Sequence, residues 1–459
     1  MIRSFSLFLL GISLFAAEPV DTIWTARHVV TMDASHRLIE NGAVAIRAGK
    51  IVAVGERSQI DAAFKAKQRL DAAGGIIAPG LIDTHTHAGM SLFRGIADDK
   101  RLQDWLQNFI FPAEARNVNA EFVRWGTRLA CLEMALSGTT TYTDMYYFED
   151  TVAEVTKEAG LRGVLGQTVI GFPAPDYKTP QEALAGAEKY IQRYKDDALI
   201  VPAVAPHAIY TTPDDVLKAA RALANKYSMP LLIHLSETRT ENEEAKQKRG
   251  MTPTRTLESL GVLNGRTVGA HGIWLDDADI AILAKHGTGL AHCPSSNMKL
   301  ASGVARVQDI LNSGIAMGLG TDGFAGSNDD ADLMKEMSLA SKLQKITRMD
   351  PESLPAERAL EMATILGARA LGLEKEIGSI ETGKKADLIL IRTDSPRAVP
   401  MYNVYSAVVY SLKAADVSDV MVNGKRIVQD HHMLTLNAKE VMAKASEYRE
   451  KIITSLEKK

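Results

Sequence analysis

Apolar and polar positions along this chain follow two different rhythms. Near the N-terminal end, short runs rich in β-branched residues (22–26, 28–32, 43–46 and 50–54) are separated by turn signals at 40–42 and 48–49. Comparable runs return near the other end, at 385–391 and 417–425. This spacing is typical of a small antiparallel sheet. We therefore expect the two chain ends to build one small β-sandwich domain together.

Between the ends, strand-like apolar runs alternate with amphipathic helical stretches. The runs cover 78–87, 138–145, 160–170, 199–205, 230–235, 267–271, 288–292 and 315–320. Eight such β units, each followed by a helical stretch, are what a (β/α)₈ TIM barrel of the α/β class requires. We predict the barrel over 77–376, the sandwich over 18–76 and 377–430, and a C-terminal helix within 431–459.

Residues 1–17 have the pattern of a secretory signal peptide. Arg3 precedes an apolar run over 5–15, and the small residues Ala16 and Ala17 follow it. The run is too short to span a bilayer comfortably, and no other stretch is long and apolar enough to do so. We expect an exported protein, periplasmic or secreted, without a stable membrane span once processed. If the signal is not used, the location is cytoplasmic.

Composition and charge exclude several classes of protein. The chain has 459 residues, of which 46% are hydrophobic and 24% charged, with a net charge of −3, so it lacks the basic excess that binds nucleic acid. Cys131 and Cys293 are its two cysteines, too few for a disulfide framework or a thiolate zinc cage. Any metal ion must therefore be held by histidine and carboxylate.

Candidate metal ligands lie at the ends of the predicted strands. His85 and His87 are two residues apart on one strand, so their side chains share a face. In a barrel the C-terminal strand ends meet at one rim, and polar residues at that rim are His85, His87, His207, His234, Glu237, His271 and Asp322. A lone histidine is usually a satisfied core residue, but a joint placement at one rim is hard to explain in that way.

Four of these residues suit one divalent ion. His85, His87, His234 and Asp322 supply three imidazoles and a carboxylate, a set for Zn²⁺ or Fe²⁺ that leaves a position for water. Binuclear barrel hydrolases commonly need a carboxylated lysine on the fourth strand, and 199–206 contains no lysine. We expect a mononuclear site, with zinc as the first candidate and iron as the second.

The motifs resemble those of a known family. They are Pro79 to His87, Leu92 to Gly95 with Trp105, Pro112 to Glu114, Ala205 to His207, His234 to Glu237, Ala270-His271, His292 to Leu300, and Gly320 to Gly323. Over nearly the whole mature chain they resemble the amidohydrolase superfamily, in the branch of deaminases for 5′-methylthioadenosine and S-adenosylhomocysteine, near the triazine hydrolases. The resemblance implies the metal ligands above, Glu237 and His271 as catalytic partners, His207 against the substrate, and a possible homo-oligomer.

The chemistry of these residue types agrees with that resemblance. A metal lowers the pKa of bound water, Asp322 can take the proton, and His271 can orient the attacking oxygen. Glu237 is the acid in reach to protonate a ring nitrogen while ammonia leaves. The alternative for Glu237 is a carboxylate at the N-terminus of the helix that starts within 237–241.

Four further residues concern the substrate. Glu114 matches the family carboxylate that holds ribose hydroxyls, and Trp105 is a candidate wall for the base or a thio substituent. The family's carboxylate-binding arginine after the third strand is replaced here by Gln167, which cannot form the same bidentate pair. Lys178 in the next loop is a candidate replacement. We therefore expect 5′-methylthioadenosine or adenosine to be preferred over S-adenosylhomocysteine.

Other functions stay open from the sequence. The same ligands serve deamination of guanine or another heteroaromatic ring, triazine dechlorination and cyclic-amide hydrolysis. A non-catalytic scaffold would use the same fold, although all the ligand positions are filled here. His292, Ser295 and Asn297 follow the seventh strand and are candidates for a supporting role, a substrate contact or core packing.

Overall fold

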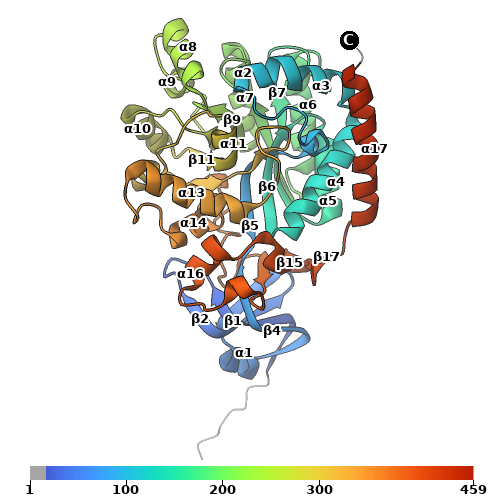
Figure 1. The fold of residues 1–459 in the computed structure, drawn as a ribbon, viewed down its shortest axis with the longest axis vertical. Helices are drawn as coiled ribbons and strands as arrows, with labels where there is room; N and C mark the ends of the chain where they lie inside the picture. The colour runs from blue at the N-terminus through green and yellow to red at the C-terminus, as the bar shows by residue number, and fades with distance from the viewer. Residues whose placement is uncertain (1–16, 458–459) are drawn as a thin grey trace, which may run out of the picture.

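A closed barrel of parallel strands forms the centre of the computed structural model, which describes residues 17–457 (Figure 1). From the first strand to the eighth, each pairs with the next, and the eighth closes on the first where Leu319 pairs with Asp83. A short ninth strand also pairs with the first. The strands are β5 (Leu81–His87), β6 (Thr139–Tyr146), β7 (Arg162–Val169), β8 (Ile200–Pro206), β9 (Leu231–Leu235), β10 (Thr267–His271), β11 (Gly289–His292), β12 (Met317–Leu319) and the short β13 (Asp322–Gly323). The predicted (β/α)₈ barrel is confirmed.

Helices cover the outside of the barrel, so its strands are buried on both faces. Every residue of β6 and β7 is buried, as expected when a parallel strand packs on a core inside and on helices outside. The helices between and after the strands are α4 (Ala120–Leu136), α5 (Glu149–Ala159), α6 (Pro180–Tyr194), α7 (Asp214–Tyr227), α8 (Arg239–Arg249), α9 (Pro253–Ser259), α10 (Asp277–His286), α11 (Pro294–Lys299), α12 (Val307–Asn312), α13 (Leu333–Arg348), α14 (Ala356–Met362) and α15 (Ile365–Leu371).

An insertion between β5 and α4 covers part of the barrel mouth. It consists of η1 (Ala88–Phe93), α2 (Leu102–Asp104), the π-helical turn η2 (Trp105–Ile110) and α3 (Phe111–Asn117). The indole Nε1 of Trp105 donates to the carbonyl oxygen of Ala325 at 2.6 Å, and Lys299 pairs with Asp98 at 2.6 Å. These contacts join the insertion to the C-terminal end of α11 and to the loop that follows the last strand.

Both chain ends contribute to a second sheet, as the sequence predicts, and it lies at the opposite end of the barrel from α2 and α8 (Figure 1). Its strand order is β17-β16-β15-β14-β4-β1-β2-β3 in one continuous hydrogen-bonded sheet. The bounds are β1 (Glu18–Val30), β2 (Leu38–Arg47), β3 (Lys50–Glu56), β4 (Phe64–Pro79), β14 (Leu388–Ile391), β15 (Val417–Val422), β16 (Lys425–Gln429) and β17 (His432–Met433), with helix α1 (Arg57–Ala63) before β4. Between β14 and β15 lie η3 (Pro396–Ala398), α16 (Val404–Ser406), η4 (Ala407–Ser411) and η5 (Ala414–Asp416).

The junction between the two sheets falls at Gly80. The sequence placed 77–79 in the barrel, but β4 continues through Pro79, which pairs with Leu388 of β14. A Cβ at Gly80 would lie 2.1 Å from Oγ1 of Thr140, so a side chain is sterically excluded there. The two predicted runs 22–26 and 28–32 also merge into the single strand β1, with an irregularity between Ala26 and His28.

The C-terminal helix α17 (Ala438–Glu457) runs along the barrel beside α4 (Figure 1). Its residues Val441, Tyr448 and Ile452 are buried, and the Tyr448 ring meets Phe122 of α4 edge to face at 5.6 Å. The predicted signal peptide lies almost wholly outside the described residues. Within 17–457, none of the helices combines the length and the apolar character needed to cross a membrane.

Candidate metal-dependent active site

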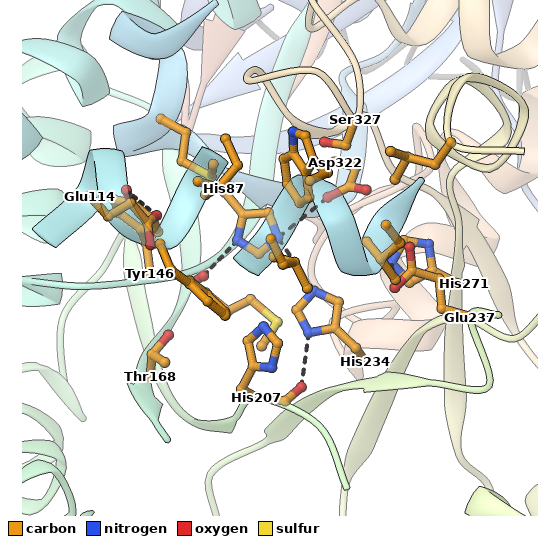
Figure 2. A pocket seen from close by; sticks show the side chains of 18 of the residues that line it. His87, Glu114, Tyr146, Thr168, His207, His234, Glu237, His271, Asp322 and Ser327 are labelled. Carbon is orange, nitrogen blue, oxygen red and sulfur yellow. Dashed lines mark hydrogen bonds and ion pairs between the residues drawn. The ribbon is translucent and has the colours of Figure 1, made fainter. Parts of the chain in front are cut away.

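One cavity at the C-terminal mouth of the barrel gathers most of the predicted site residues (Figure 2). Strand ends supply its polar floor, and the insertion over the mouth supplies an apolar wall. The polar lining residues are His87, Glu114, Tyr146, Tyr147, Thr168, His207, Tyr210, His234, Glu237, His271, Asp322 and Ser327. The insertion contributes Met90, Leu102, Trp105, Leu106, Ile110 and Phe111 to the apolar wall, and Met145 and Leu300 complete the lining.

The four predicted metal ligands converge at this floor. Oδ1 of Asp322 lies 3.4 Å from Nε2 of His85 and 3.3 Å from Nε2 of His87. Nε2 of His234 lies 3.4 Å from Nε2 of His87. His85 is not a lining residue of the cavity, but its ring centroid is 5.0 Å from that of His234. Side chains from β5, β9 and β13 therefore meet at one point.

The hydrogen bonds behind these imidazoles suit a cation in front of them. Nδ1 of His87 lies 2.7 Å from the carbonyl oxygen of Met145, and Nδ1 of His234 lies 2.8 Å from that of His207. A carbonyl can only accept, so both Nδ1 atoms carry the proton and the two Nε2 lone pairs face each other. Nε2 of buried His85 also has no hydrogen-bond partner among the described residues. These nitrogens and one carboxylate fit Zn²⁺ or Fe²⁺.

Burial and the Asp322 carboxylate set the charge states of the imidazoles at this floor. It lowers the pKa of His85 to about 4 and the pKa of His207 to about 3, and it holds the pKa of His234 well below its usual value. Burial also opposes charge on His87, but the neighbouring Asp322 carboxylate outweighs it and raises the pKa of His87 to about 8. Metal ligation requires neutral imidazole, so ion binding must displace a proton from the pair of His87 and Asp322.

The two predicted catalytic partners lie together beside the ligands. Oε2 of Glu237 is 3.8 Å from Nε2 of His271, and both side chains are almost completely buried. Burial raises the pKa of Glu237 above its usual value, as an acid that donates a proton near neutral pH requires. The carboxylate of Glu241 accepts the backbone N–H of Glu237 at 2.7 Å and fixes the loop that carries it. The sequence did not single out Glu241.

Glu114 and Trp105 line the cavity on the insertion, and His207 lines it after β8. Glu114 lies on the other side of the ligand cluster from Glu237 (Figure 2). Its carboxylate accepts the hydroxyl of Tyr146 at 2.7 Å, and burial raises its pKa to about 7. His207 faces the cavity while its Nδ1 lies 2.8 Å from Oγ1 of Thr211.

Gln167 and Lys178 do not line the cavity. The amide nitrogen of Gln167 donates to Oδ2 of Asp176 at 2.8 Å, and Nζ of Lys178 donates to the carbonyl oxygen of Ala174 at 2.8 Å. Among residues 17–457, no lysine or arginine side chain lines this cavity. The predicted contact of Gln167 with the substrate therefore has no support from its position here.

Several cavity residues were missed from the sequence. Tyr146 and Thr168 stand at the C-terminal ends of β6 and β7, so the same strand-end rule that selected the histidines would have found them. Tyr210 and Ser327 lie on loops, where the sequence carries no periodic signal. His292 is fully buried with both ring nitrogens lacking a hydrogen-bond partner among the described residues, and it does not line the cavity.

A family model and curated proteins match this chain over most or nearly all of its length. A model described as the amidohydrolase family matches residues 76–427. The 5-methylthioadenosine/S-adenosylhomocysteine deaminase 1 of Syntrophus aciditrophicus (strain SB) is 45% identical over 439 residues, which cover 96% of this chain and 99% of the relative. A 5-methylthioadenosine/S-adenosylhomocysteine deaminase of Thermodesulfovibrio yellowstonii is 44% identical over 433 residues, covering 94% of this chain and 98% of that protein.

Solved structures share the fold. The crystal structure of an adenosine deaminase from Xanthomonas campestris with bound zinc is 36% identical, with a TM-score of 0.94 over 96% of this chain and 100% of that one. An atrazine chlorohydrolase from Arthrobacter aurescens TC1 complexed with zinc has a TM-score of 0.86 over 93% of this chain and 100% of its own. It is 23% identical, so that likeness concerns the fold alone.

Proposed function

This chain belongs to the amidohydrolase family, and on that premise we propose that it hydrolytically deaminates an adenosine-type nucleoside. The observation that carries the proposal is the cavity floor, where three imidazoles and the Asp322 carboxylate face one point. The acid Glu237 and the imidazole of His271 lie beside that point, 3.8 Å apart. Two relatives that are 45% and 44% identical over nearly the whole chain are named deaminases, which supports the same reaction.

The ligand set would hold one divalent metal ion, which we propose to be zinc. Its donors would be His85, His87, His234 and Asp322, whose facing nitrogen and oxygen atoms lie 3.3–3.4 Å apart, and a structural relative at 36% identity carries zinc. When bound, such an ion supplies a water molecule whose pKa is lowered towards neutrality. A single ion is consistent with β8, which carries no lysine.

The protein side chains then direct two protons. Deamination consumes one water, and of its two protons one ends on the ring nitrogen and the other on the ammonia. Glu237 delivers the first from its carboxyl group, which burial keeps protonated to higher pH than usual. It recovers a proton from the added oxygen as that oxygen becomes the carbonyl, so the second proton of the water replaces the one that Glu237 gave to the ring nitrogen. Asp322 accepts a proton from the attacking water and passes it to the exocyclic amine, after which the carbon–nitrogen bond breaks. His271, through Nε2, orients the water for attack.

The remaining cavity residues support a nucleoside with a neutral 5′ substituent. The Glu114 carboxylate lines the cavity and would accept the ribose hydroxyls, and the apolar wall with Trp105 suits a base or an alkylthio group. A carboxylate at the end of a homocysteine tail would meet no cationic side chain from the described residues that line the cavity. We therefore propose that 5′-methylthioadenosine and adenosine are better substrates than S-adenosylhomocysteine.

Ammonia release from the zinc-loaded protein tests this function. The substrates are adenosine, 5′-methylthioadenosine, S-adenosylhomocysteine, guanine and a chlorotriazine. We expect release from the first two, at least tenfold lower kcat/KM for S-adenosylhomocysteine, and a loss of about 10²–10⁴-fold in kcat for Glu237→Gln. Glu237→Gln should retain zinc like the wild type, because Glu237 is not a ligand.

Two results would contradict the proposal. If a protein that holds stoichiometric zinc releases no ammonia from any nucleoside, adenosine-type deamination is excluded. Dechlorination or cyclic-amide hydrolysis would then remain. Preference for S-adenosylhomocysteine would show that a cation reaches the 5′ tail and would overturn the specificity alone.

A further inference from the structure

We propose that Ser296 and Asn297, neighbours on the short helix α11, are positioning residues that hold Asp322 and His271 in their working orientations. Neither residue lines the cavity, so each acts through the group that it holds. The inference rests on the proposed deaminase function for the roles of Asp322 and His271. Its geometric part, which concerns carboxylate orientation and imidazole tautomer, can be measured without turnover.

Ser296 gives the two oxygens of the Asp322 carboxylate different partners. Its hydroxyl donates to Oδ2 at 2.5 Å, and the serine side chain is completely buried. Oδ1 faces the imidazoles of His85 and His87 at 3.4 and 3.3 Å. Carboxylate rotation about its terminal bond is otherwise soft. The serine hydroxyl therefore fixes which oxygen faces the ligand histidines and which oxygen accepts from α11.

Asn297 sets the tautomer of His271. Its Oδ1 lies 3.1 Å from Nδ1 of His271, and the amide side chain is 1% exposed. An amide oxygen only accepts, so Nδ1 carries the proton and Nε2 keeps its lone pair. That lone pair is on the atom nearest to Glu237, 3.8 Å from its Oε2. Without the amide, the ring could rotate or place its proton on Nε2, where it could no longer accept a hydrogen bond from water.

Backbone geometry explains why the two groups need this support. His271 and Asp322 both have positive φ angles, 75° and 65°, in the left-handed region that non-glycine residues rarely adopt. A non-glycine residue in this conformation is strained and persists only where its surroundings hold it. Side-chain bonds from α11 reach both of these strained strand ends, one from each of two adjacent residues.

Helix α11 is itself anchored from outside the barrel. The backbone N–H of Ser295 donates to Oε2 of Glu336 on α13 at 2.9 Å, and its hydroxyl donates to Oε1 of the same carboxylate. Glu336 is completely buried. The three successive side chains at 295–297 therefore connect α13, the metal-ligand strand end and the catalytic histidine.

Substitution of each residue separates these roles. On the zinc-loaded protein we expect Ser296→Ala to lower kcat for 5′-methylthioadenosine about 10–100-fold and to raise the zinc dissociation constant by a similar factor. Asn297→Ala should lower kcat about 10–100-fold without changing zinc affinity, because His271 is not a ligand. Both should leave KM within about twofold. Asn297→Asp, which keeps an accepting oxygen, should recover part of the loss.

The measurements are steady-state kinetics, competition for zinc with a chromogenic chelator, and ¹H–¹⁵N NMR spectra of protein labelled at histidine. The spectra report which imidazole nitrogen of His271 carries the proton. We expect the Nδ1–H signal of His271 in the wild type and in Asn297→Asp, and its loss in Asn297→Ala. Ser341→Ala is the matched control. The buried hydroxyl of Ser341, on α13, donates to the carbonyl oxygen of Leu354 at 2.7 Å, and Ser341 does not line the cavity. It should change neither kcat nor zinc affinity.

The outcomes distinguish this inference from the proposed function. Unchanged kcat and zinc affinity in folded Ser296→Ala, or an unchanged Nδ1–H signal in Asn297→Ala, would overturn it. If the wild type releases no ammonia, the zinc and imidazole readouts still decide the geometry. If Ser296→Ala does not fold, Ser296→Cys, which keeps the volume but donates weakly, should show the same weakening of zinc binding.

Discussion

At the scale of single residues, burial rather than residue type sets the chemistry of this site. Glu237 and Glu114 are both glutamates in one cavity, but they have different partners. Glu237 faces an imidazole at 3.8 Å, whereas Glu114 accepts one hydroxyl, from Tyr146, at 2.7 Å. A buried carboxyl with so few donors prefers its neutral form, and the pKa of Glu114 accordingly rises to about 7.

That shift predicts a pH-dependent affinity for nucleosides. Because the pKa of Glu114 is raised, the group is largely protonated at pH 6 and ionised at pH 8, and the ionised form is the better acceptor for ribose hydroxyls. KM for 5′-methylthioadenosine should therefore fall as pH rises through about 7. Glu114→Gln should raise KM about 10–100-fold and flatten this dependence. The measurement is KM against pH for both proteins.

A substrate without ribose hydroxyls is the control for the Glu114 prediction. A 2′,3′-dideoxy nucleoside should show little change of KM with pH and little effect of Glu114→Gln. An equally steep dependence for both substrates would assign the titration to another group.

At the scale of elements, the approach of α4 to η1 fixes the segment that directly follows His87. Gly126 lies inside α4, and a Cβ there would stand 2.2 Å from the carbonyl oxygen of Gly89. The hydroxyl of Ser91 in η1 also donates to the carbonyl oxygen of Gly126 at 2.6 Å. Backbone therefore meets backbone at this contact, and no side-chain movement can make room.

Gly126→Ala should destabilise the protein despite the higher helix propensity of alanine. The intrinsic gain is about 1 kcal/mol, whereas overpacking costs about 1–3 kcal/mol and here displaces the chain next to a metal ligand. We expect a lower Tm and weaker zinc retention, measured by thermal unfolding and chelator competition. Gly186→Ala on α6 is the control, because its Cβ would meet only the hydroxyl end of the Tyr177 side chain. Equal stability of the two variants would contradict the packing argument.

At the scale of the whole molecule, a buried ion pair joins the barrel to the sheet built from the chain ends. Arg162 opens β7, and its Nη2 and Nε lie 3.1 and 3.2 Å from Oδ2 of Asp387, next to β14. The two side chains are 5% and 2% exposed. Asp387 also accepts the backbone N–H of Asn423 at 2.6 Å. One carboxylate thus connects three parts of the chain.

Removing one partner of this pair should be costly. Asp387→Ala leaves a buried guanidinium uncompensated, and we expect the free energy of unfolding to fall by about 3–5 kcal/mol in denaturant titration. The double variant Arg162→Met with Asp387→Leu should recover much of that loss. Glu154→Ala, which breaks the exposed pair with Arg124, is the control and should cost at most about 1 kcal/mol. A loss for Asp387→Ala no larger than this control would refute the structural role.

The sequence alone determined the barrel and the positions of its strand-end chemistry. Local periodicity identified the strands, and a barrel brings all C-terminal strand ends to one rim whatever the side chains do. The sequence could therefore group residues that lie up to 237 positions apart, namely His85, His87, His234, His271 and Asp322. That rule depends on the topology of the barrel, and it does not require the side-chain conformations to be known.

Only the tertiary structure decided which way the side chains turn and what they bind. Gln167 lies on a correctly predicted strand, but its amide donates to Asp176. The sequence offered Asn297 as a candidate for a supporting role, but only the structure gives its partner, His271, and the bond from Ser296 to Asp322. The strand β4 likewise extends to Pro79 because β14, from the far end of the chain, pairs with it. Competition among nonlocal hydrogen-bond partners settles such choices, and residue spacing along the chain carries no record of it.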